Sequence, residues 1–449
     1  MRQPWPRFGK TRHSFFRLPE SLVCKKETVP RWEGLLVICT LCIFAHDGGN
    51  AMRQNQYTPA SELQHRIQAL QQALDKEGLD GALIFHHINL FYYSGTSQSA
   101  HLFVPRAGEP LLLARKSFER ARRESALAEV IESPGLKDMP ALLRERGYTL
   151  RKVGLELDIT PWNTVQFYAK NFAGSTFADI SKQMKRIRMI KSDYEIALLL
   201  AAAEAHTAVF AEVPGMLREG MTELELAGLY EAAMRRRGFS GGCRMRAFNQ
   251  SHFLGNVNSG TSGAVPTFFD GPVGGAGATA ASQPHGASWK TIGRGEPIYI
   301  DYTCIIDGYT VDQTRMFCIG KMPEKMRAAY EAALAIQDAV LARIRPGVPW
   351  DEVYLHAVEL AEQHGLADCF MGLGKDRVRF AGHGVGLELD EFPVFAPGLK
   401  MPLEKGMVFA LEPTFVFPEG AVGIENTHVV TENGVRTLTG AAQEIICVP

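Results

Sequence analysis

One stretch organises this chain: Pro297-Ile-Tyr-Ile-Asp301-Tyr-Thr-Cys-Ile-Ile-Asp307-Gly308-Tyr-Thr-Val-Asp312-Gln-Thr-Arg-Met-Phe-Cys318. Its β-branched and aromatic residues predict two strands. Asp307-Gly308 between them is a strong signal for a two-residue hairpin turn. We therefore expect an antiparallel hairpin centred on this turn.

Two carboxylates follow from the register of this hairpin. A turn at residues 307–308 places Asp301 opposite Thr314 and makes Asp312 its diagonal neighbour on the same face. Diagonal neighbours lie about 7–8 Å apart at the backbone. Because two bare carboxylates on a mostly apolar face repel each other and are costly to desolvate, we expect a cation between them. The alternative is a pair of solvated acids on an open face.

The composition excludes several classes of protein. The chain has 449 residues, of which 46% are hydrophobic, which suffices for two or three domains. Its net charge of −1 provides no basic field, so we expect neither a nucleic-acid partner nor a membrane partner. Of the eight cysteines, the five beyond residue 51 have no regular spacing, which indicates reduced thiols and a cytoplasmic location.

Residues 1–51 differ from the rest of the chain. Lysines and arginines precede an apolar run from Leu35 to Ala45. This run is too short to span a bilayer, which takes about 20 residues, although it has the length of a signal-peptide core. We favour a third interpretation, in which Gly48-Gly49-Asn50 is encoded by a ribosome-binding sequence and translation begins at Met52.

Residues 52–185 alternate strand patterns with helix patterns, which indicates an α/β domain. Ser61-Glu-Leu-Gln64 has the pattern of a capping box at the start of a helix. Strands are expected at 82–85, 90–93, 102–104, 111–114 and 153–155, and helices near 117–129, 138–146 and 160–170. The basic segment 179–191 is expected to be a solvated connector or an interface strand.

A second domain is expected over residues 192–449. Ser192-Asp-Tyr-Glu195 and Thr222-Glu-Leu-Glu225 are capping boxes that open two helices before the hairpin. After the hairpin, helices near 323–344 and 350–364 precede apolar strands at 382–386, 408–413 and 421–430. Two helices and then strands therefore occur twice, which indicates an internal duplication.

The duplication predicts a second pair of carboxylates, Glu412 and Glu425. A turn around Glu419-Gly420 puts Glu412 opposite Thr427 and makes Glu425 its diagonal neighbour on the same face. His383 lies between glycines that allow other groups to approach closely. The two halves together offer four carboxylates, and His383 can add an imidazole.

This set of ligands suits two divalent cations. Oxygen-rich ligation favours Mn²⁺, and an imidazole admits Co²⁺, Fe²⁺ or Zn²⁺. Two metal ions about 3.5–4 Å apart generate hydroxide near neutral pH and polarise a carbonyl. We therefore expect hydrolysis of an amide or a related C–N bond.

At these residues the chain resembles the pita-bread metallopeptidases, in the branch of Xaa-Pro dipeptidase, aminopeptidase P and creatinase. The resemblance covers about residues 52–449. It implies a creatinase/prolidase-type α/β domain over 52–185 and an α+β pita-bread catalytic domain over 192–449, built as two αα-ββ halves. It also implies a homodimer.

The resemblance also implies roles for single residues. Asp301 and Glu425 match the ligands that bridge both metal ions. Asp312 matches the ligand that completes one metal site, and His383 with Glu412 matches those of the other site. Glu412 also matches the carboxylate that shuttles a proton from the bridging water.

Three further positions concern the substrate. His285, in Gln283-Pro-His-Gly286, matches a histidine that contacts the substrate or the intermediate. Family peptidases carry a second histidine seven residues after the ligand histidine, and this chain has Asp390 at that position. Aminopeptidases P carry an arginine two residues before the last ligand, and this chain has Gly423 there. An imidazole can donate to an oxyanion, whereas an ionised aspartate cannot. Asp390 is therefore either protonated or bound to a cationic group of the substrate.

Three functions are compatible with this sequence. The leading one is a dinuclear metal-dependent Xaa-Pro peptidase that acts on small peptides through a metal-bridging hydroxide. Asp390 and Gly423 favour an alternative, the hydrolysis of a small non-peptide amide or amidine, as in creatinase-like and ectoine-derivative hydrolase relatives. The third is a non-catalytic pita-bread binding module, which the presence of all five ligand positions disfavours.

Overall fold

The central hairpin forms as its turn residues require. In the computed structural model, which describes residues 57–246, 248–249 and 254–449, β8 (Ile298–Ile306) pairs antiparallel with β9 (Tyr309–Ile319). Asp307 and Gly308 have φ angles of 49° and 88°, as a two-residue hairpin turn requires. Asp301 lies opposite Thr314, so the expected register is confirmed.

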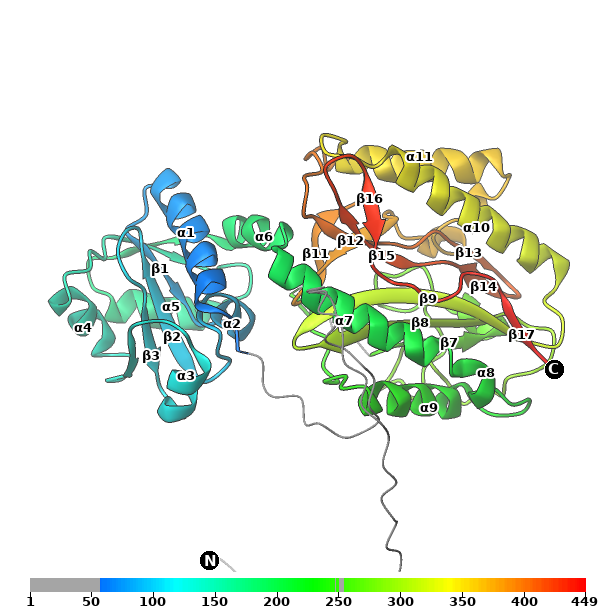
Figure 1. Ribbon diagram of the computed structural model, residues 1–449, viewed down its shortest axis with the longest axis horizontal. Coiled ribbons are helices and arrows are strands. Elements are labelled where there is room, and N and C mark those ends of the chain that lie inside the picture. Colours follow the sequence, from blue (N-terminus) through cyan, green and yellow to red (C-terminus); the bar gives the residue numbers. More distant parts are fainter. Residues whose placement is uncertain (1–56, 247, 250–253) are drawn as a thin grey trace, which may run out of the picture. The chain divides into compact units, whose positions relative to one another are not determined.

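Two larger sheets and one short hairpin build the second domain (Figure 1). One sheet has the order β17-β9-β8-β7 and the other β11-β10-β12-β15-β16, while β13 and β14 form a two-stranded sheet. The remaining strands are β7 (Gly255–Ser259), β10 (Gly382–Val385), β11 (Leu389–Val394), β12 (Val408–Leu411), β13 (Thr414–Phe417), β14 (Gly420–Gly423), β15 (Asn426–Val430), β16 (Val435–Thr437) and β17 (Ile446–Val448).

The helices of this domain show the expected duplication. The helices of the first half are α7 (Asp193–Phe210), the short α8 (Val213–Met216) and α9 (Glu223–Arg236). The second half has α10 (Glu324–Arg343) and α11 (Trp350–Gln363), followed by β10 to β16. Figure 1 shows α10 and α11 beside the strands of the second half and α7 along β8 and β9. The prediction of two αα-ββ halves is confirmed.

Local capping explains where two of these helices begin. Both predicted capping boxes are present: Ser192 opens α7 and Thr222 opens α9, and each exchanges hydrogen bonds with the glutamate three residues later. The predicted box at Ser61 was wrong, because α1 (Ala60–Lys76) begins directly after Pro59 and already contains Ser61. Proline presets a helical φ and disfavours helix in the residue before it, so it sets the start of α1.

The first domain is a mixed six-stranded sheet with the order β4-β3-β2-β1-β5-β6. Its strands are β1 (Gly81–Ile84), β2 (Ala100–Pro105), β3 (Leu111–Ala114), β4 (Val130–Glu132), β5 (Lys152–Leu155) and β6 (Thr176–Asp179). Its helices, after α1, are α2 (His87–Ser94), α3 (Phe118–Glu124), α4 (Met139–Glu145), α5 (Trp162–Asn171) and α6 (Ser181–Met189). The expected α/β class is confirmed.

Two expectations about this domain were wrong. The expected strand at 90–93 is the second half of helix α2, where Leu90, Tyr92 and Tyr93 are buried. Periodicity cannot separate strand from helix in so short an apolar run. The expected connector at 179–191 is mostly helix α6, and Arg188 within it is buried because two glutamates from the second domain pair with it.

Residues Asn55–Pro449 form one compact unit. The proposed domain boundaries at residues 185 and 192 stay a prediction, and the expectations for residues 1–51 concern a segment outside the described residues. Among the described residues, no helix has both the length and the apolar character needed to cross a bilayer.

Candidate metal centre

All five predicted ligand residues line one small cavity in the second domain. Asp301 comes from β8, Asp312 from β9 and His383 from β10. Glu412 directly follows β12, and Glu425 directly precedes β15. The cavity holds about 40 Å³. A site for one water needs roughly 10–15 Å³ on the same measure, so there is room for a few water-sized species.

A bridge between the two sheets brings the carboxylates of the two halves together. The backbone N–H of Thr314 in β9 donates to the carbonyl of Glu425 over 3.3 Å. The Thr314 hydroxyl also donates to Oε2 of Glu425 over 2.9 Å. Since Thr314 is the residue opposite Asp301, this contact places Glu425 beside the first carboxylate pair.

The predicted position of Glu412 needs a correction. Thr427 lies opposite Ala410, and Glu412 follows the end of β12 instead of facing Thr427. The turn at 418–419 does form, since Phe417 pairs with Gly420. The long hairpin breaks at Pro413, because proline has no N–H to donate to a ladder. Glu412 still lines the cavity, although the expected register was wrong.

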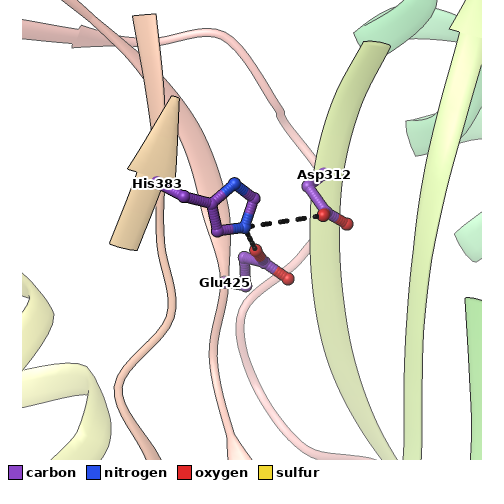
Figure 2. A group of neighbouring side chains, drawn as sticks. All are labelled: Asp312, His383 and Glu425. Atoms are coloured by element: carbon purple, nitrogen blue, oxygen red, sulfur yellow. Dashed lines mark ion pairs between the residues drawn. The ribbon is translucent and has the colours of Figure 1, made fainter. Parts of the chain in front are cut away.

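The imidazole of His383 faces three carboxylates through its Nε2 atom. Its distances are 3.6 Å to Oε1 of Glu412, 3.9 Å to Oε1 of Glu425 and 4.0 Å to Oδ2 of Asp312. Figure 2 shows the ring directed at Asp312 and Glu425. Asp312, His383 and Glu425 offer ligand atoms within 4.8 Å of one another, which is close enough for a single ion.

The glycines beside His383 are required by packing. A Cβ on Gly384 would lie 2.2 Å from the carbonyl oxygen of Phe392, and one on Gly382 would lie 2.3 Å from that of Ala410. Both neighbours are backbone atoms of adjacent strands. The expectation that these glycines permit close approach is therefore confirmed.

Burial and mutual repulsion raise the pKa values of the four carboxyl groups. Desolvation is the largest cause for each, and it raises the pKa of Asp301 to about 6. The pKa values of Asp312, Glu412 and Glu425 lie well above the usual range, because desolvation is joined by repulsion among the carboxylates. Proximity thus makes full ionisation unfavourable without a compensating cation.

The residues present fit divalent metal ions. Within the described part of the chain, the only ion pairs to these carboxylates come from His383, and neither lysine nor arginine approaches them within 4.0 Å. Asn256, which lies opposite Asp301 and lines the cavity, has a buried Oδ1 with no hydrogen-bond partner among the described residues. Oxygen donors around uncompensated negative charge are what hard divalent cations require.

The structure shows what surrounds Asp390 and Gly423, the two positions at which the sequence departs from the family pattern. Asp390 lines the cavity, and its Oδ1 lies 3.4 Å from Nδ1 of His383. A Cβ on Gly423 would lie 2.2 Å from Oγ1 and 2.9 Å from Cβ of Thr414. An arginine therefore cannot occupy position 423 in this conformation.

His285 does not line the cavity. Its Nδ1 lies 2.9 Å from the hydroxyl of Thr267, and its ring packs on Phe269, which does line the cavity. Burial lowers the pKa of His285 to about 4, so the ring is neutral near pH 7. The contact of His285 with a substrate stays a prediction.

Sequence reasoning missed the residues that hold the ligands in place. Arg315 is 1% exposed and donates to the backbone carbonyls of Thr314 and Glu425 over 2.7 and 2.9 Å. It also donates to Oδ1 of Asn426 over 2.8 Å. The place of Arg315 in Asp312-Gln-Thr-Arg315 was a possible signal, whereas nothing in the sequence marked Asn256.

Comparison with known proteins finds one family model for each of the two domains. The model of metallopeptidase family M24 matches residues 197–432, and that of the creatinase/prolidase N-terminal domain matches residues 66–190. An Xaa-Pro dipeptidase of Pyrococcus furiosus is 28% identical over 389 residues, which is 86% of this chain and 100% of the relative.

Solved structures are similar over the same extent. An Xaa-Pro dipeptidase from Bacillus anthracis has a TM-score of 0.73 and 25% identity, covering 86% of this chain and 100% of that one. An X-Pro aminopeptidase from Thermotoga maritima has a TM-score of 0.71 and 25% identity, covering 83% and 98%. With its clustered carboxylates, its histidine and its two-domain fold, this chain belongs to metallopeptidase family M24.

Proposed function

We propose that this protein is a metal-dependent Xaa-Pro peptidase that hydrolyses small peptides. The observation that carries the proposal is the small cavity in which four carboxylates and His383 meet, with no lysine or arginine of the described chain among its lining residues. Relatives named Xaa-Pro dipeptidase match over their full length, which supports this substrate class.

The proposal assigns five residues to two divalent cations. Asp301 and Glu425 would hold both ions, Asp312 would complete one site, and His383 with Glu412 would complete the other. Such a pair of ions, when bound, supplies Lewis-acid polarisation of the scissile carbonyl and activates a water molecule near neutral pH. Mn²⁺ is the proposed metal because four of the five ligands are carboxylates, with Co²⁺, Zn²⁺ or Fe²⁺ as alternatives.

Three residues serve the reaction, two of them from the wall of the cavity. Glu412 accepts the proton of the attacking water and returns it to the leaving nitrogen, a general-base role open to a carboxylate that lines the cavity. Asp390 faces the bound peptide from the wall of the cavity and also faces the imidazole of His383. His285 supports the substrate from behind Phe269.

A second candidate function is hydrolysis of a small non-peptide amide or amidine. Two observations favour it: an acid stands at position 390, and Thr414 occupies the space that an arginine at position 423 would need. Without that arginine, the carboxyl end of a peptide lacks one cationic partner. A small substrate with a cationic group would be better matched to Asp390.

A substrate panel tests both functions. The purified chain is stripped with EDTA, reloaded with Mn²⁺, Co²⁺ or Zn²⁺, analysed for bound metal, and incubated with Xaa-Pro dipeptides, Xaa-Pro tripeptides and creatine. Release of proline from the dipeptides is expected. Stoichiometric metal with creatine turnover and no proline release would select the second function, and failure to bind metal would refute both.

The proposal extends to the assembly and location of the protein. We expect a homodimer in the cytoplasm, with domain boundaries near residues 185 and 192. The described cysteines are free thiols, which supports a reducing compartment. They are Cys243, Cys304, Cys318, Cys369 and Cys447. Light scattering of the purified chain measures the assembly.

A further inference from the structure

A second cavity adjoins the metal centre. It holds about 230 Å³, and Asp390 lines both cavities. Its walls come from the segment after α9, from the residues around the start of β11 and from α6. The phenyl rings of Phe248 and Phe392 contribute apolar surface, and Arg246 and Glu388 contribute charge.

Most of the charge around this cavity is already paired. Arg246 donates to Asp158 over 2.7 and 2.9 Å and to Glu156 over 2.9 Å. On the other wall, Arg188 donates to Oε2 of Glu388 over 2.6 Å and also pairs with Glu391. These ion pairs hold both walls in place, so the cavity is preformed.

Two buried polar atoms remain without partners. Among the described residues, neither Nη1 of Arg246 nor Oε1 of Glu388 has a hydrogen-bond partner. The two side chains are 10% and 3% exposed. A buried donor or acceptor left unpaired costs about 1–3 kcal/mol, and more when charged. Both side chains line this cavity. A ligand that enters it with one acceptor and one donor is therefore the group best suited to satisfy both atoms.

We propose that this cavity is the specificity pocket for the amino-terminal side chain of the substrate, and that it selects a side chain ending in a primary amide, such as glutamine. A primary amide carries an acceptor and a donor on adjacent atoms. Its oxygen accepts from Nη1 of Arg246, its nitrogen donates to Oε1 of Glu388, and its aliphatic stem lies against the two phenyl rings. The proposal rests on the proposed Xaa-Pro activity, in which only the amino-terminal residue varies.

Other side chains satisfy the pocket less well. A carboxylate has no donor and is repelled by Glu388, whereas an ammonium has no acceptor and is repelled by Arg246. An apolar side chain such as methionine fills the space but leaves both polar atoms unpaired. A site built to hydrogen-bond its substrate discriminates strongly against analogues that lack the polar group.

The test compares kcat/KM for Gln-Pro, Met-Pro, Glu-Pro and Lys-Pro with the metal-loaded enzyme. Gln-Pro is expected to exceed Met-Pro by about 10- to 100-fold, the range for hydrogen bonds to charged partners. Equal values for Gln-Pro and Met-Pro, or a preference for Lys-Pro or Glu-Pro, would overturn the pocket assignment. If none of these peptides nor Ala-Pro releases proline, the proposed function itself fails.

Arg246→Lys keeps the positive charge toward Asp158 but loses the second guanidinium nitrogen. It is expected to lower the ratio of kcat/KM for Gln-Pro over Met-Pro by about tenfold. Arg122→Lys, on the exposed face of α3, is the matched control and should leave the ratio unchanged. The proposal would be overturned if Arg246→Lys left the ratio of kcat/KM for Gln-Pro over Met-Pro at its wild-type value.

A second variant covers the case in which Arg246→Lys does not fold. Phe248 is 93% exposed, so Phe248→Ala leaves the core intact. It removes one apolar wall and is expected to lower kcat/KM for Gln-Pro about threefold or more relative to Ala-Pro, which has no stem to pack. An equal effect on both peptides would argue against a side-chain pocket.

Discussion

Nδ1 of His383 lies 3.4 Å from Oδ1 of Asp390, on the side of the ring opposite the Nε2 atom that faces three carboxylates. Nδ1 also lies 3.3 Å from the carbonyl oxygen of Gly384. Both neighbours are acceptors, so they favour a proton on Nδ1 and leave Nε2 free to bind a cation. Asp390, with a φ of 61°, is thus placed to orient the ligand imidazole.

Asp390→Asn should weaken metal binding. Asparagine tolerates a positive φ and still offers an oxygen to Nδ1, but it lacks the negative charge. Loss of such an outer partner typically costs about 10- to 100-fold in affinity. Competition with a chromophoric chelator measures the change, and Asp376→Asn on an exposed turn is the control. Unaltered affinity would restrict Asp390 to a role in substrate binding.

Asp312→Asn should abolish activity by removing a metal ligand. Asp312 lies 4.0 Å from Nε2 of His383 and is 6% exposed, so no solvent ligand can readily replace it. We expect loss of at least one metal equivalent by elemental analysis and turnover below about 1% of wild type. Asp307→Asn, in the exposed turn of the same hairpin, should retain metal and activity. Near-normal turnover by Asp312→Asn would refute the ligand assignment.

Removing the metal should lower the melting temperature. The four carboxylates repel one another in the folded chain, and a cation that binds only the folded form relieves this. Free metal at 100 times its Kd adds about 2.7 kcal/mol to the free energy of unfolding. Scanning calorimetry of the EDTA-treated and reloaded protein tests this. Adding the metal back should leave the melting temperature of Asp312→Asn largely unchanged. A rise equal to that of the wild type would indicate that the metal binds elsewhere.

Glu391→Gln should destabilise the fold in a pH-dependent way. Although desolvation acts to raise the pKa of Glu391, Arg188 and Lys191 lower it to about 2, below its ordinary value of 4.5. The charged form thus stabilises the folded state above about pH 4.5, and this contribution is lost as the pH falls toward 2. We expect Glu391→Gln to lower the free energy of unfolding by about 3 kcal/mol at pH 7 and by about half as much near pH 3. Urea unfolding of the wild type and of Glu391→Gln measures this difference in the free energy of unfolding. A difference that does not vary with pH would contradict the prediction.

Gly423→Ala should destabilise the second half of the catalytic domain. The new Cβ would lie 2.9 Å from Cβ of Thr414, an atom fixed to the partner strand. Overpacking of this kind costs about 1–3 kcal/mol. Gly228→Ala is the matched control, because it lies on exposed helix α9 with no atom within 4 Å and should stabilise by about 0.5–1 kcal/mol. Denaturant unfolding of both variants gives the comparison.

Local chemistry explains the sequence-based expectations that were confirmed. The turn residues Asp307-Gly308 set the register of Asp301 and Thr314, because a two-residue turn allows only one pairing of its strands. Ser192 and Thr222 mark helix starts because their hydroxyls cap backbone N–H groups nearby in sequence. Each of these features depends on residues a few positions apart.

The expectations that failed had a local cause in one case and a distant cause in the other. Pro413 interrupts the second hairpin, so Glu412 reaches the cavity from outside a strand. Arg188 lies on the buried side of helix α6, where glutamates 200 and 203 residues away neutralise it. A basic segment without such partners would be solvated, and nothing near Arg188 in the sequence reveals them.

The sequence by itself determined the two αα-ββ halves, which follow from short-range periodicity and turn chemistry. It also named the five ligand candidates, although the register from which Glu412 was chosen is corrected by the structure. Only the tertiary structure decided that Asp390 faces the imidazole of His383 and that Arg246 and Glu388 leave unpaired atoms on one cavity. Those relationships join segments far apart along the chain. Their distances are set by the packing of sheets and helices, which no local pattern encodes.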